Sequence, residues 1–555
     1  MKFVITIIMF LVTILSEAQN VTITPSGITP EQVISRLTTA QRTLPTFQNA
    51  QNAGKLVFDI DNGQLYLWDG AFWKRIESER DGAEIPSFER TNNNEEGNDN
   101  FGDAVAISGE WAIIGAPRQG TKGEAYIFRR TINSWKLQKK LCFDLINSLV
   151  SDGAKFGTDV DIDIVPGGPV VVGAPEQGGV GKAYVFRYKT VSGITDWVFE
   201  PATGTTTPLS HPSPLSGDQF GFSVAIEDNY IIIGAPFDDV FIPGLIANTP
   251  NAGSATIFKA TNHGTFHTWA GMGIGLGPTI QIEYTSTGAH AGWDVDITEN
   301  YINLITREYS VIVGVPHVGI FAQNGVNTNP GYKGRADLYI LNNTSNAWVI
   351  SKNFTKEYLD NINYNQFSIG SANDNFHIGN RVELKNRILI IGAPGFQTNI
   401  NPFSDQYTYK PNYNCEGKYC IFRTDSIWAV GTIKTSYGRG SSVSSTKSKM
   451  GRFFATDGKY ILQYVIDQYN DGNGTIKPPI HYLTISEIDT ESTSSGLEFI
   501  SISKLIYIRK ESSLDYEITS VALEKSGNFI FGKKIDNNDI SKVVDVVNFG
   551  NINSN

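Results

Sequence analysis

Cysteine is scarce in this chain, with three among 555 residues. Their spacing matches no cysteine-ligated metal site. Cys142, in the stretch KKLCFDL, is expected to be a buried apolar residue on a strand. Cys415 and Cys420 lie in NCEGKYC, around an expected turn at 416–417. We expect them to form a disulfide in an oxidising compartment; two unpaired thiols are the alternative, because spacing alone does not guarantee the geometry.

Long apolar runs are also missing after the N-terminus. The one such run, Phe3 to Leu15, follows a lysine and is followed by Ser16-Glu17-Ala18, which is typical of a signal peptide cleaved after Ala18. We therefore expect residues 1–18 to be removed and the mature protein to be secreted or held at the cell surface. No later stretch approaches the ~20 apolar residues of a membrane span, and no cysteine at the cleavage point provides a lipid anchor.

Basic clusters and catalytic motifs are missing as well. With a net charge of −11, the chain lacks the basic surface expected of a protein that binds nucleic acid or anionic lipid. The seven histidines are scattered, and the one close pair, His263 and His267, is interrupted by Gly264, so no zinc site is expected. No G-x-S-x-G motif or Ser-His-Asp arrangement is found. We therefore expect neither an enzyme nor a cofactor.

The chain is instead rich in glycine, with 54 residues, and in short apolar runs that end at Gly-Ala-Pro. Three units share one order: FGDAVAISGEWAIIGAP then EAYIFRR at 101–130, FGTDVDIDIVPGGPVVVGAP then KAYVFRY at 156–188, and FGFSVAIEDNYIIIGAP then SATIFKA at 220–260. The step from the Phe-Gly glycine to the GAP glycine is 13 residues in the first, third and fifth units, as from Gly102 to Gly115. A period of about sixty residues indicates one repeated structural unit.

Each unit is expected to be a four-stranded antiparallel meander. Val105 and Ile107 alternate with smaller residues, the run before GAP is apolar on both faces, and a tryptophan opens a fourth run. Glycine allows close backbone approach, and proline ends the hydrogen bonding of the strand. Weaker units at 291–341, 378–422, 450–467 and 517–535 bring the count to seven. Because such sheets must cover one another, we predict an all-β fold, a seven-bladed β-propeller of four-stranded antiparallel blades over residues 97–555, with a small N-terminal extension.

Residues 19–96 precede the repeats and contain a linker and a small set of strand-like runs. Two of these, GQLYLWDG and FWKRIES at 63–78, are similar to the third and fourth strands of a unit. Two arrangements are open. The runs supply the strand that the seventh unit lacks, or they form a meander of their own with a turn at Asp61-Asn62-Gly63.

The Phe-Gly strand followed by Gly-Ala-Pro and A-Y-[IV]-F resembles the FG-GAP repeat, the blade unit of integrin alpha-subunit propellers and of many secreted bacterial proteins. The resemblance covers roughly residues 97–555 and is strongest in the first three units. It implies a seven-bladed propeller whose loops on one face bind protein or carbohydrate partners. Because fold analogy does not carry function, the ligand stays open.

One feature of that family is missing. Integrin-like blades often carry a D-x-D-x-D-G calcium loop, whereas the corresponding loops here read SGEW, EDNY and LKNR. The rows Asp159-Val-Asp161-Ile-Asp163 and Asp294-Val-Asp296 are expected to be polar strand residues, because a strand sets carboxylates in a line. The weak calcium candidates in DQYNDGNG, for which a plain turn is preferred, are Asp467, Asn470, Asp471 and Asn473. We expect no family-type calcium site.

Three consecutive units carry a long insertion after GAP, at Phe237–Asn251, His317–Tyr332 and Phe396–Tyr413. Such loops are usually functional or disordered, the bland alternative being tolerated solvated insertions. The candidate binding residues are Phe237, Asp238, Asp239, Phe241, Phe321, Asn324, Tyr332, Phe396, Phe403, Tyr407 and Tyr409. We expect an exported, non-catalytic binding or adhesion protein that engages a protein or glycan through these loops. The alternatives are a glycan-active enzyme with acidic residues in the propeller funnel, or a structural component of a surface assembly.

Overall fold

A computed structural model describes the larger part of the chain. The described residues are 35–42, 44, 46, 55–59, 64–68, 73–75, 84–85, 99–131, 135–163, 168–240, 249–263, 266–272, 279–280, 287–301, 307–318, 333–342, 347–355, 377–386, 388–393, 418–423, 432–433, 436–437, 454–467, 480–492, 498–509, 516–523, 528–535 and 542–548. The chain divides into two compact units, Met1–Ala83 with Phe549–Asn555, and Glu84–Asn548. Among the residues described, no helix has the length and apolar character needed to cross a membrane.

The smaller unit contains one sheet, in the order β1-β2-β3-β4, and the short helix α2 (Thr39–Arg42). Its strands are β1 (Ser35–Leu37), β2 (Leu56–Asp59), β3 (Gln64–Trp68) and β4 (Trp73–Arg75). β1 is parallel to β2, and the other pairs are antiparallel. The runs at 64–68 and 73–75 therefore pair with each other within this unit.

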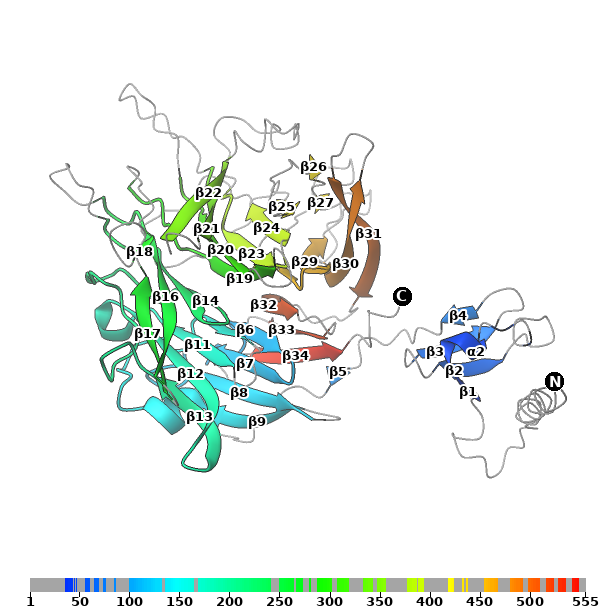
Figure 1. Ribbon diagram of the computed structural model, residues 1–555, viewed down its shortest axis with the longest axis horizontal. Helices are drawn as coiled ribbons and strands as arrows, with labels where there is room; N and C mark the ends of the chain where they lie inside the picture. Colours follow the sequence, from blue (N-terminus) through cyan, green and yellow to red (C-terminus); the bar gives the residue numbers. More distant parts are fainter. Residues whose placement is uncertain are drawn as a thin grey trace, which may run out of the picture. The chain divides into compact units, whose positions relative to one another are not determined.

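The larger unit is a succession of sheets, each built mainly from strands that follow one another in the chain (Figure 1). Sheet 1 contains β6 (Val105–Ser108), β7 (Trp111–Ala116), β8 (Glu124–Arg130) and β9 (Trp135–Lys140). Sheet 2 contains β10 (Val160–Ile162), β11 (Pro169–Ala174), β12 (Lys182–Val191) and β13 (Ile194–Glu200). Sheet 3 contains β14 (Ser223–Glu227), β15 (Tyr230–Ala235), β16 (Ser254–His263), β17 (Phe266–Met272) and the short β18 (Thr279–Ile280).

The later sheets keep this order. Sheet 4 contains β19 (Val295–Tyr301), β20 (Arg307–Val315), β21 (Arg335–Asn342) and β22 (Ala347–Thr355). Sheet 5 contains β23 (Arg381–Lys385), β24 (Ile388–Ala393), β25 (Lys418–Arg423) and β27 (Ser436–Tyr437). Sheet 6 contains β28 (Phe454–Thr456), β29 (Tyr460–Asp467), β30 (Ile480–Ser492), β31 (Glu498–Arg509) and β26 (Thr432–Ile433). Sheet 7 contains β32 (Tyr516–Leu523), β33 (Asn528–Ile535), β34 (Lys542–Asn548) and β5 (Glu84–Ile85).

Within these sheets the consecutive strands pair antiparallel, as the alternating apolar pattern and short turns predict. A tryptophan lies in the fourth strand of each of the first four sheets, at Trp135, Trp197, Trp269 and Trp348. The prediction of an all-β fold with four-stranded antiparallel sheets is confirmed. The fourth strand of sheet 7 comes from residues 84–85, which pair with β34.

The Phe-Gly motif and the aromatic residues of the third strand meet in the core of a unit. The Phe-Gly phenylalanine packs edge-on against an aromatic residue of the third strand, with ring centroids 5.3 Å apart for Phe101 and Tyr126 and 5.2 Å apart for Phe156 and Tyr184. The second strand lies between neighbouring strands and neighbouring sheets, so Ile113 and other residues of this strand are fully buried. The apolar character on both of its faces follows from this position.

Glycine contacts join neighbouring sheets. A Cβ atom on Gly115, the GAP glycine of sheet 1, would lie 2.1 Å from the carbonyl oxygen of Gly157, the Phe-Gly glycine of sheet 2. No real Cβ atom sits that close to another atom, and Gly157 itself has a φ of 91°, so both positions require glycine. The same contact recurs from Gly173 to Gly221 (2.0 Å), from Gly234 to Gly292 (2.1 Å) and from Gly314 to Gly379 (2.0 Å).

The last sheet makes the same contact with the first. A Cβ atom on Gly532 of β33 would lie 2.0 Å from the carbonyl oxygen of Gly102. Thr519 Oγ1 and Ser520 Oγ donate hydrogen bonds to this oxygen at 2.7 and 2.8 Å. The first strands contact one another in chain order from β6 to β32, and β32 contacts β6. Sheet 7 therefore packs against sheet 1 through the same kind of contact that joins sheets 1 to 5.

Cys142 is buried, as expected, but its predicted place on a strand is wrong. β9 ends at Lys140, and Cys142 begins the π-helix η3 (Cys142–Ile146). Its N–H donates to Oε1 of the buried Glu124 at 2.6 Å, and the N–H of Phe143 donates to Oε2 at 2.9 Å. The Glu124 carboxylate thus accepts hydrogen bonds from two backbone amides that would otherwise be available to a continuing strand. Burial raises the pKa of Glu124 to about 7.

We expect Gly173→Ala to destabilise the protein by about 3 kcal/mol, because the added Cβ would push the backbones of sheets 2 and 3 apart. Gly178→Ala is the control: its Cβ would meet nothing within 4 Å, although its φ of 61° costs about 1 kcal/mol. Denaturant unfolding of both variants measures the difference. Equal losses of stability would contradict a steric role for the GAP glycine.

Candidate functional site

A cavity of about 870 Å³, here called the central cavity, lies along the first strands of the sheets in the larger unit. Its wall includes residues in or beside β6, β10, β14, β19, β23, β28 and β32. Figure 1 shows β6, β14, β19, β23 and β32 toward the middle of this unit. The packing of the first strands against one another therefore creates the cavity.

Acidic side chains far outnumber basic ones on the cavity wall. Alternate residues of a strand face the same side, which explains the spacing of the rows in sheets 2 and 4. The cavity-lining acidic residues are Asp103, Asp159, Asp161, Asp163, Glu227, Asp228, Asp294, Asp296, Glu299, Glu383 and Asp457. At the positions matching Asp159 and Asp161, sheets 1 and 3 carry the small residues Ala104 and Ala106, and Ser223 and Ala225.

The acidic rows bind the free edge of the next first strand. Asp159 Oδ2 accepts the N–H of Val224 at 2.7 Å, and Asp161 Oδ2 accepts that of Ile226 at 2.8 Å. These amides lie on the edge of β14 that faces away from β15, where unpaired N–H groups would be costly. Asp294 and Asp296 accept from Val382 (2.6 Å) and Leu384 (2.5 Å) of β23 in the same way. The rows therefore act as structural residues of the sheets.

Two basic residues offset part of this charge. Arg381 Nη1 lies 3.3 Å from Asp294 Oδ1, and Lys385 Nζ lies 2.5 Å from Glu227 Oε2. Burial raises the pKa of Asp159, Asp161 and Glu383 to about 7. These three groups thus change protonation near neutral pH, unlike ordinary carboxylates.

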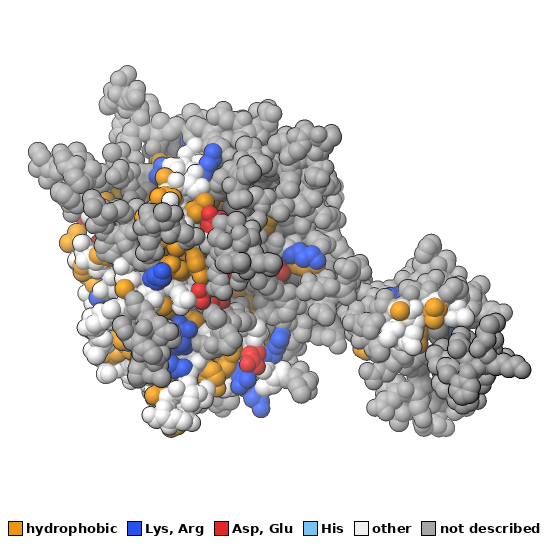
Figure 2. Space-filling view, viewed as in Figure 1, with side chains coloured by type: hydrophobic (Ala, Val, Ile, Leu, Met, Phe, Trp, Pro, Cys, Tyr) orange, Lys and Arg blue, Asp and Glu red, His pale blue; other side chains and the backbone are white. Residues whose placement is uncertain are grey.

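Aromatic and polar side chains meet at one end of the cavity, here called the rim. The GAP glycines are found at this end. The residue after each Phe-Gly glycine, or after its equivalent, also lies here. The residues at this position are Asp103, Thr158, Phe222, Trp293 and Asn380. The rings of Phe222 and Trp293 are 5.0 Å apart, and Phe237 lies 6.3 Å from Trp293. Figure 2 shows acidic and hydrophobic side chains side by side on one face of the larger unit.

Three histidines adjoin these aromatic rings. His290 Nδ1 lies 2.7 Å from His317 Nδ1, the His317 ring lies 5.0 Å from that of His377, and it lies 5.3 Å from Trp293. Burial lowers the pKa of His290 to about 4 and of His377 to about 3, and it also lowers that of His317. These rings are therefore neutral at pH 7, and the rim presents aromatic and neutral polar groups beside the carboxylates.

In the sequence these histidines are far apart and were expected to be scattered. Their positions within the repeat units indicate that they lie close together. His290 and His377 directly precede the Phe-Gly equivalents of units four and five, and His317 directly follows the proline of the fourth GAP equivalent. Residues at matching positions of neighbouring units lie at the same level of the fold. Aligning the units would therefore have placed the three histidines together.

Of the candidate binding residues, three lie in the described part of the chain. Phe237 contacts His290, with ring centroids 5.0 Å apart, and so lies at the rim. Asp239 Oδ1 accepts the N–H of Asn251 at 2.9 Å, across the base of the first insertion. Asp238 is buried 3.4 Å from His211 Nε2.

The other candidates lie outside the described residues, namely Phe241, Phe321, Asn324, Tyr332, Phe396, Phe403, Tyr407, Tyr409, Cys415, Asn470, Asp471 and Asn473. For Cys420 and Asp467, in β25 and β29, the backbone alone is described. The disulfide and the calcium candidates stay predictions.

Comparisons with known proteins agree with the repeat. Residues 91–128 and 212–258 match the family model of the FG-GAP repeat. No curated protein sequence matches the chain. Among solved structures, a protein from Lactobacillus plantarum is similar, with 9% identity, a TM-score of 0.37, and coverage of 80% of this chain and 92% of that one. A candidate 6-phosphogluconolactonase from Bacteroides uniformis is also similar, with 10% identity, a TM-score of 0.34, and coverage of 80% and 95%.

The acidic row predicts a pH effect. Because burial raises the folded-state pKa of Asp161 to about 7, the stability it contributes is present at low pH and is lost as pH rises toward 8. Asp161→Asn should therefore flatten the fall in unfolding free energy between pH 5 and pH 8 by about 2 kcal/mol. His290, His317 and His377 contribute to the unfolding free energy with the opposite pH dependence, since their contribution decreases below about pH 6.5. Both proteins share this contribution, so it cancels in the difference between the variant and the wild type. Thr158→Ala, a cavity variant without a titrating group, should keep the wild-type slope, and an unchanged slope in Asp161→Asn would contradict the assignment.

Proposed function

The chain carries FG-GAP repeats, and from this premise we propose that it is an exported, non-catalytic binding or adhesion protein, a seven-bladed β-propeller that binds carbohydrate at the rim of its central cavity. The seven blades are supported by the succession from sheet 1 to sheet 7 and by the contact of Gly532 with Gly102. Export is supported by the apolar run from Phe3 to Leu15.

The rim is the observation that carries the carbohydrate proposal. Trp293 and Phe222 are half-buried and offer an apolar surface to a sugar ring, while Asp103, Thr158 and Asn380 at the same level offer donors and acceptors to hydroxyl groups. An apolar lining with a few fixed polar groups is the usual chemistry of a small-ligand site. The neutral histidines beside Trp293 add no charge that would favour an anion.

The insertions lie where they can extend this surface. The first two follow β15 and β20 directly after the GAP prolines, so both start at the rim, whereas the third, Phe396–Tyr413, lies outside the described residues. Phe237 and His317, which open the first two, both contact Trp293. A ligand seated on Trp293 would therefore lie within reach of Phe237 and His317, where the first two insertions begin.

Glycan hydrolysis is the second candidate function. It is favoured by the carboxylates with pKa values of about 7, since a general acid needs such a value. Asp159 and Asp161, however, each accept a backbone N–H of the next strand, which occupies an oxygen that an acid or a nucleophile would use. Binding without catalysis is therefore the better supported of the two.

A glycan array on the mature chain, followed by calorimetry on the best sugar, tests the proposal. We expect Trp293→Ala to weaken binding about thirtyfold, as expected for the loss of about 2 kcal/mol at a central aromatic contact. Phe143→Ala is the matched control, because Phe143 is 69% exposed and lies outside the cavity wall.

An affinity unchanged in Trp293→Ala would remove the rim as the binding site. Release of product from the bound glycan would favour the enzyme, and its loss in Asp161→Asn would place the reaction in the cavity. Binding to a co-purified protein, with no sugar retained on the array, would replace the carbohydrate with a protein ligand.

A further inference from the structure

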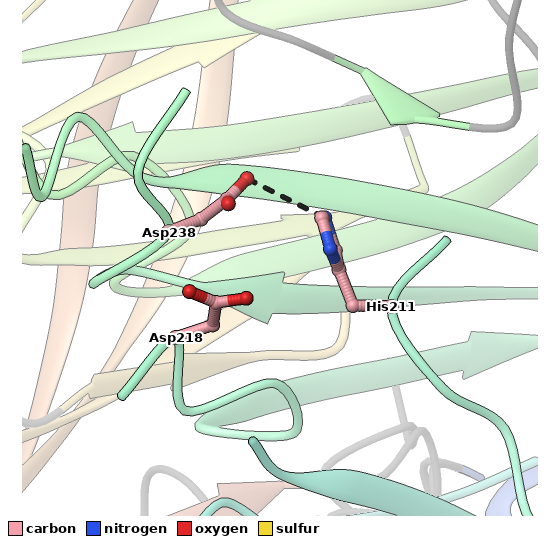
Figure 3. A group of neighbouring side chains, drawn as sticks. All are labelled: His211, Asp218 and Asp238. Atoms are coloured by element: carbon pink, nitrogen blue, oxygen red, sulfur yellow. Dashed lines mark ion pairs between the residues drawn. The ribbon is translucent and has the colours of Figure 1, made fainter. Parts of the chain in front are cut away.

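A second group of polar residues lies away from the central cavity, at the base of the first insertion. His211, Asp218 and Asp238 are each at least 95% buried, and one ligand atom of each lies within 4.8 Å of the others. Figure 3 shows the three side chains pointing toward one another from separate segments of the chain. They come from the connection after sheet 2, the residues before the Phe-Gly of sheet 3, and the residues after its GAP.

The spacing of the donor atoms suits a cation better than a direct bond. His211 Nε2 lies 3.4 Å from Asp238 Oδ2, whereas a charge-assisted N–H···O bond is about 2.8 Å long. Two ligands about 2.1 Å from a Zn²⁺ ion, at the tetrahedral angle, lie about 3.4 Å apart. Ser254 Oγ, 3.3 Å from His211 Nε2, provides a further oxygen at the same place.

The charge in this group is unbalanced. The charged residues that act on Asp218 are His211, Asp238 and Asp239, and those that act on Asp238 are His211 and Asp239, with no lysine or arginine among them. Burial raises the pKa of Asp218 to about 6 and also raises that of Asp238. Two buried carboxylates of this kind are normally paired with a cation or a metal ion.

The fold itself does not require these polar residues. The N–H of Phe237 bonds to the carbonyl of Asp218 at 3.4 Å, and the N–H of His317 bonds to that of Ala289 at 3.3 Å, so these pairs occupy matching places in sheets 3 and 4. Where sheet 3 has Asp218 and Asp238, sheet 4 has Ala289, which is buried in the apolar cluster between sheets 3 and 4, and Val318, which is partly buried and packs against that cluster. Sheet 4 thus builds the same backbone with an apolar pair. In sheet 3, Asp218 Oδ2 accepts the N–H of Leu215 at 2.6 Å, a local bond that leaves Oδ1 to face the other side chains of the group.

We propose that His211, Asp218 and Asp238 bind a divalent transition-metal ion of the Zn²⁺ class, with Ser254 Oγ beside it. One imidazole nitrogen with two carboxylates suits such an ion, whereas Ca²⁺ and Mg²⁺ prefer oxygen ligands alone. The residues are buried, so the ion is structural rather than catalytic. It joins three segments at the foot of the first insertion, where the Val240–Thr249 bridge also closes the loop.

Ion binding requires a change at His211. The N–H of Ser213 lies 3.3 Å from Nδ1, so in the ion-free arrangement Nε2 carries the proton. An ion on Nε2 requires the other neutral tautomer, and the long bond from Ser213 is then lost. Binding therefore shifts the imidazole tautomer, which nitrogen-15 NMR of labelled histidine detects.

The test uses the tag-free mature chain, stripped with a chelator and titrated with ZnCl₂ by calorimetry, with CoCl₂ as a spectroscopic probe. We expect calorimetry to show one tight zinc site and the melting temperature of the protein to rise when zinc is bound. The visible absorption spectrum should be that of a Co²⁺ ion with a low coordination number. The double variant Asp218→Ala/Asp238→Val, which carries the residues of sheet 4, should fold and bind at least a hundredfold more weakly. Asp239→Asn removes a nearby charge but no ligand, so it should bind within a few-fold of the wild type.

Zinc affinity that is equal in the wild type and the double variant would overturn the proposal. If the double variant does not fold, Asp238→Asn and His211→Gln decide the matter, since each removes one ligand and should alter the Co²⁺ spectrum; an unaltered spectrum in both overturns it. These readouts do not involve carbohydrate, so they stand apart from the glycan-binding experiment.

Discussion

The rest of the structure depends on the contact between the GAP glycine of one sheet and the Phe-Gly glycine of the next. With about 2 Å between a hypothetical Cβ and the facing carbonyl oxygen, no side chain fits, and the two backbones pack directly. This close approach brings the first strands side by side, which covers the apolar second strands from both sides. The last sheet meets the first through the same pair, at Gly532 and Gly102.

The cavity and the rim follow from that packing. First strands held side by side leave one edge of each without a strand partner, and the acidic rows of sheets 2 and 4 satisfy the amides of that edge. The half-buried carboxylates are thereby desolvated, which raises their pKa values, while the residue after each Phe-Gly glycine lies at the rim. The position of a residue relative to the Phe-Gly glycine of its unit therefore determines whether it is a structural carboxylate or one of the rim side chains proposed to bind a sugar.

The sequence could predict what depends on neighbours in the chain and not what depends on distant segments. The strands at 105–108 and 111–116 and the strand role of Asp159 and Asp161 follow from alternation and from the Gly-Ala-Pro stop. The partner of Gly115 lies in the next unit, and the donor to Asp159 lies 65 residues away, so neither is visible in a local pattern. The same holds for His211 with Asp218 and Asp238, whose segments meet only after the sheets have packed, whereas an alignment of the units places the three histidines at one level.

Hydrogen–deuterium exchange on Gly532→Ala and the wild type tests the central claim most directly. If the glycine contact joins sheet 7 to sheet 1, the variant should lose protection in β33 and also in β6, although the two strands are separated by more than 400 residues of chain. Gly178→Ala, whose Cβ meets no neighbour, should lower the protection of the two strands equally and by no more than its own loss of stability. Lost protection confined to β33, with β6 unchanged, would contradict the account.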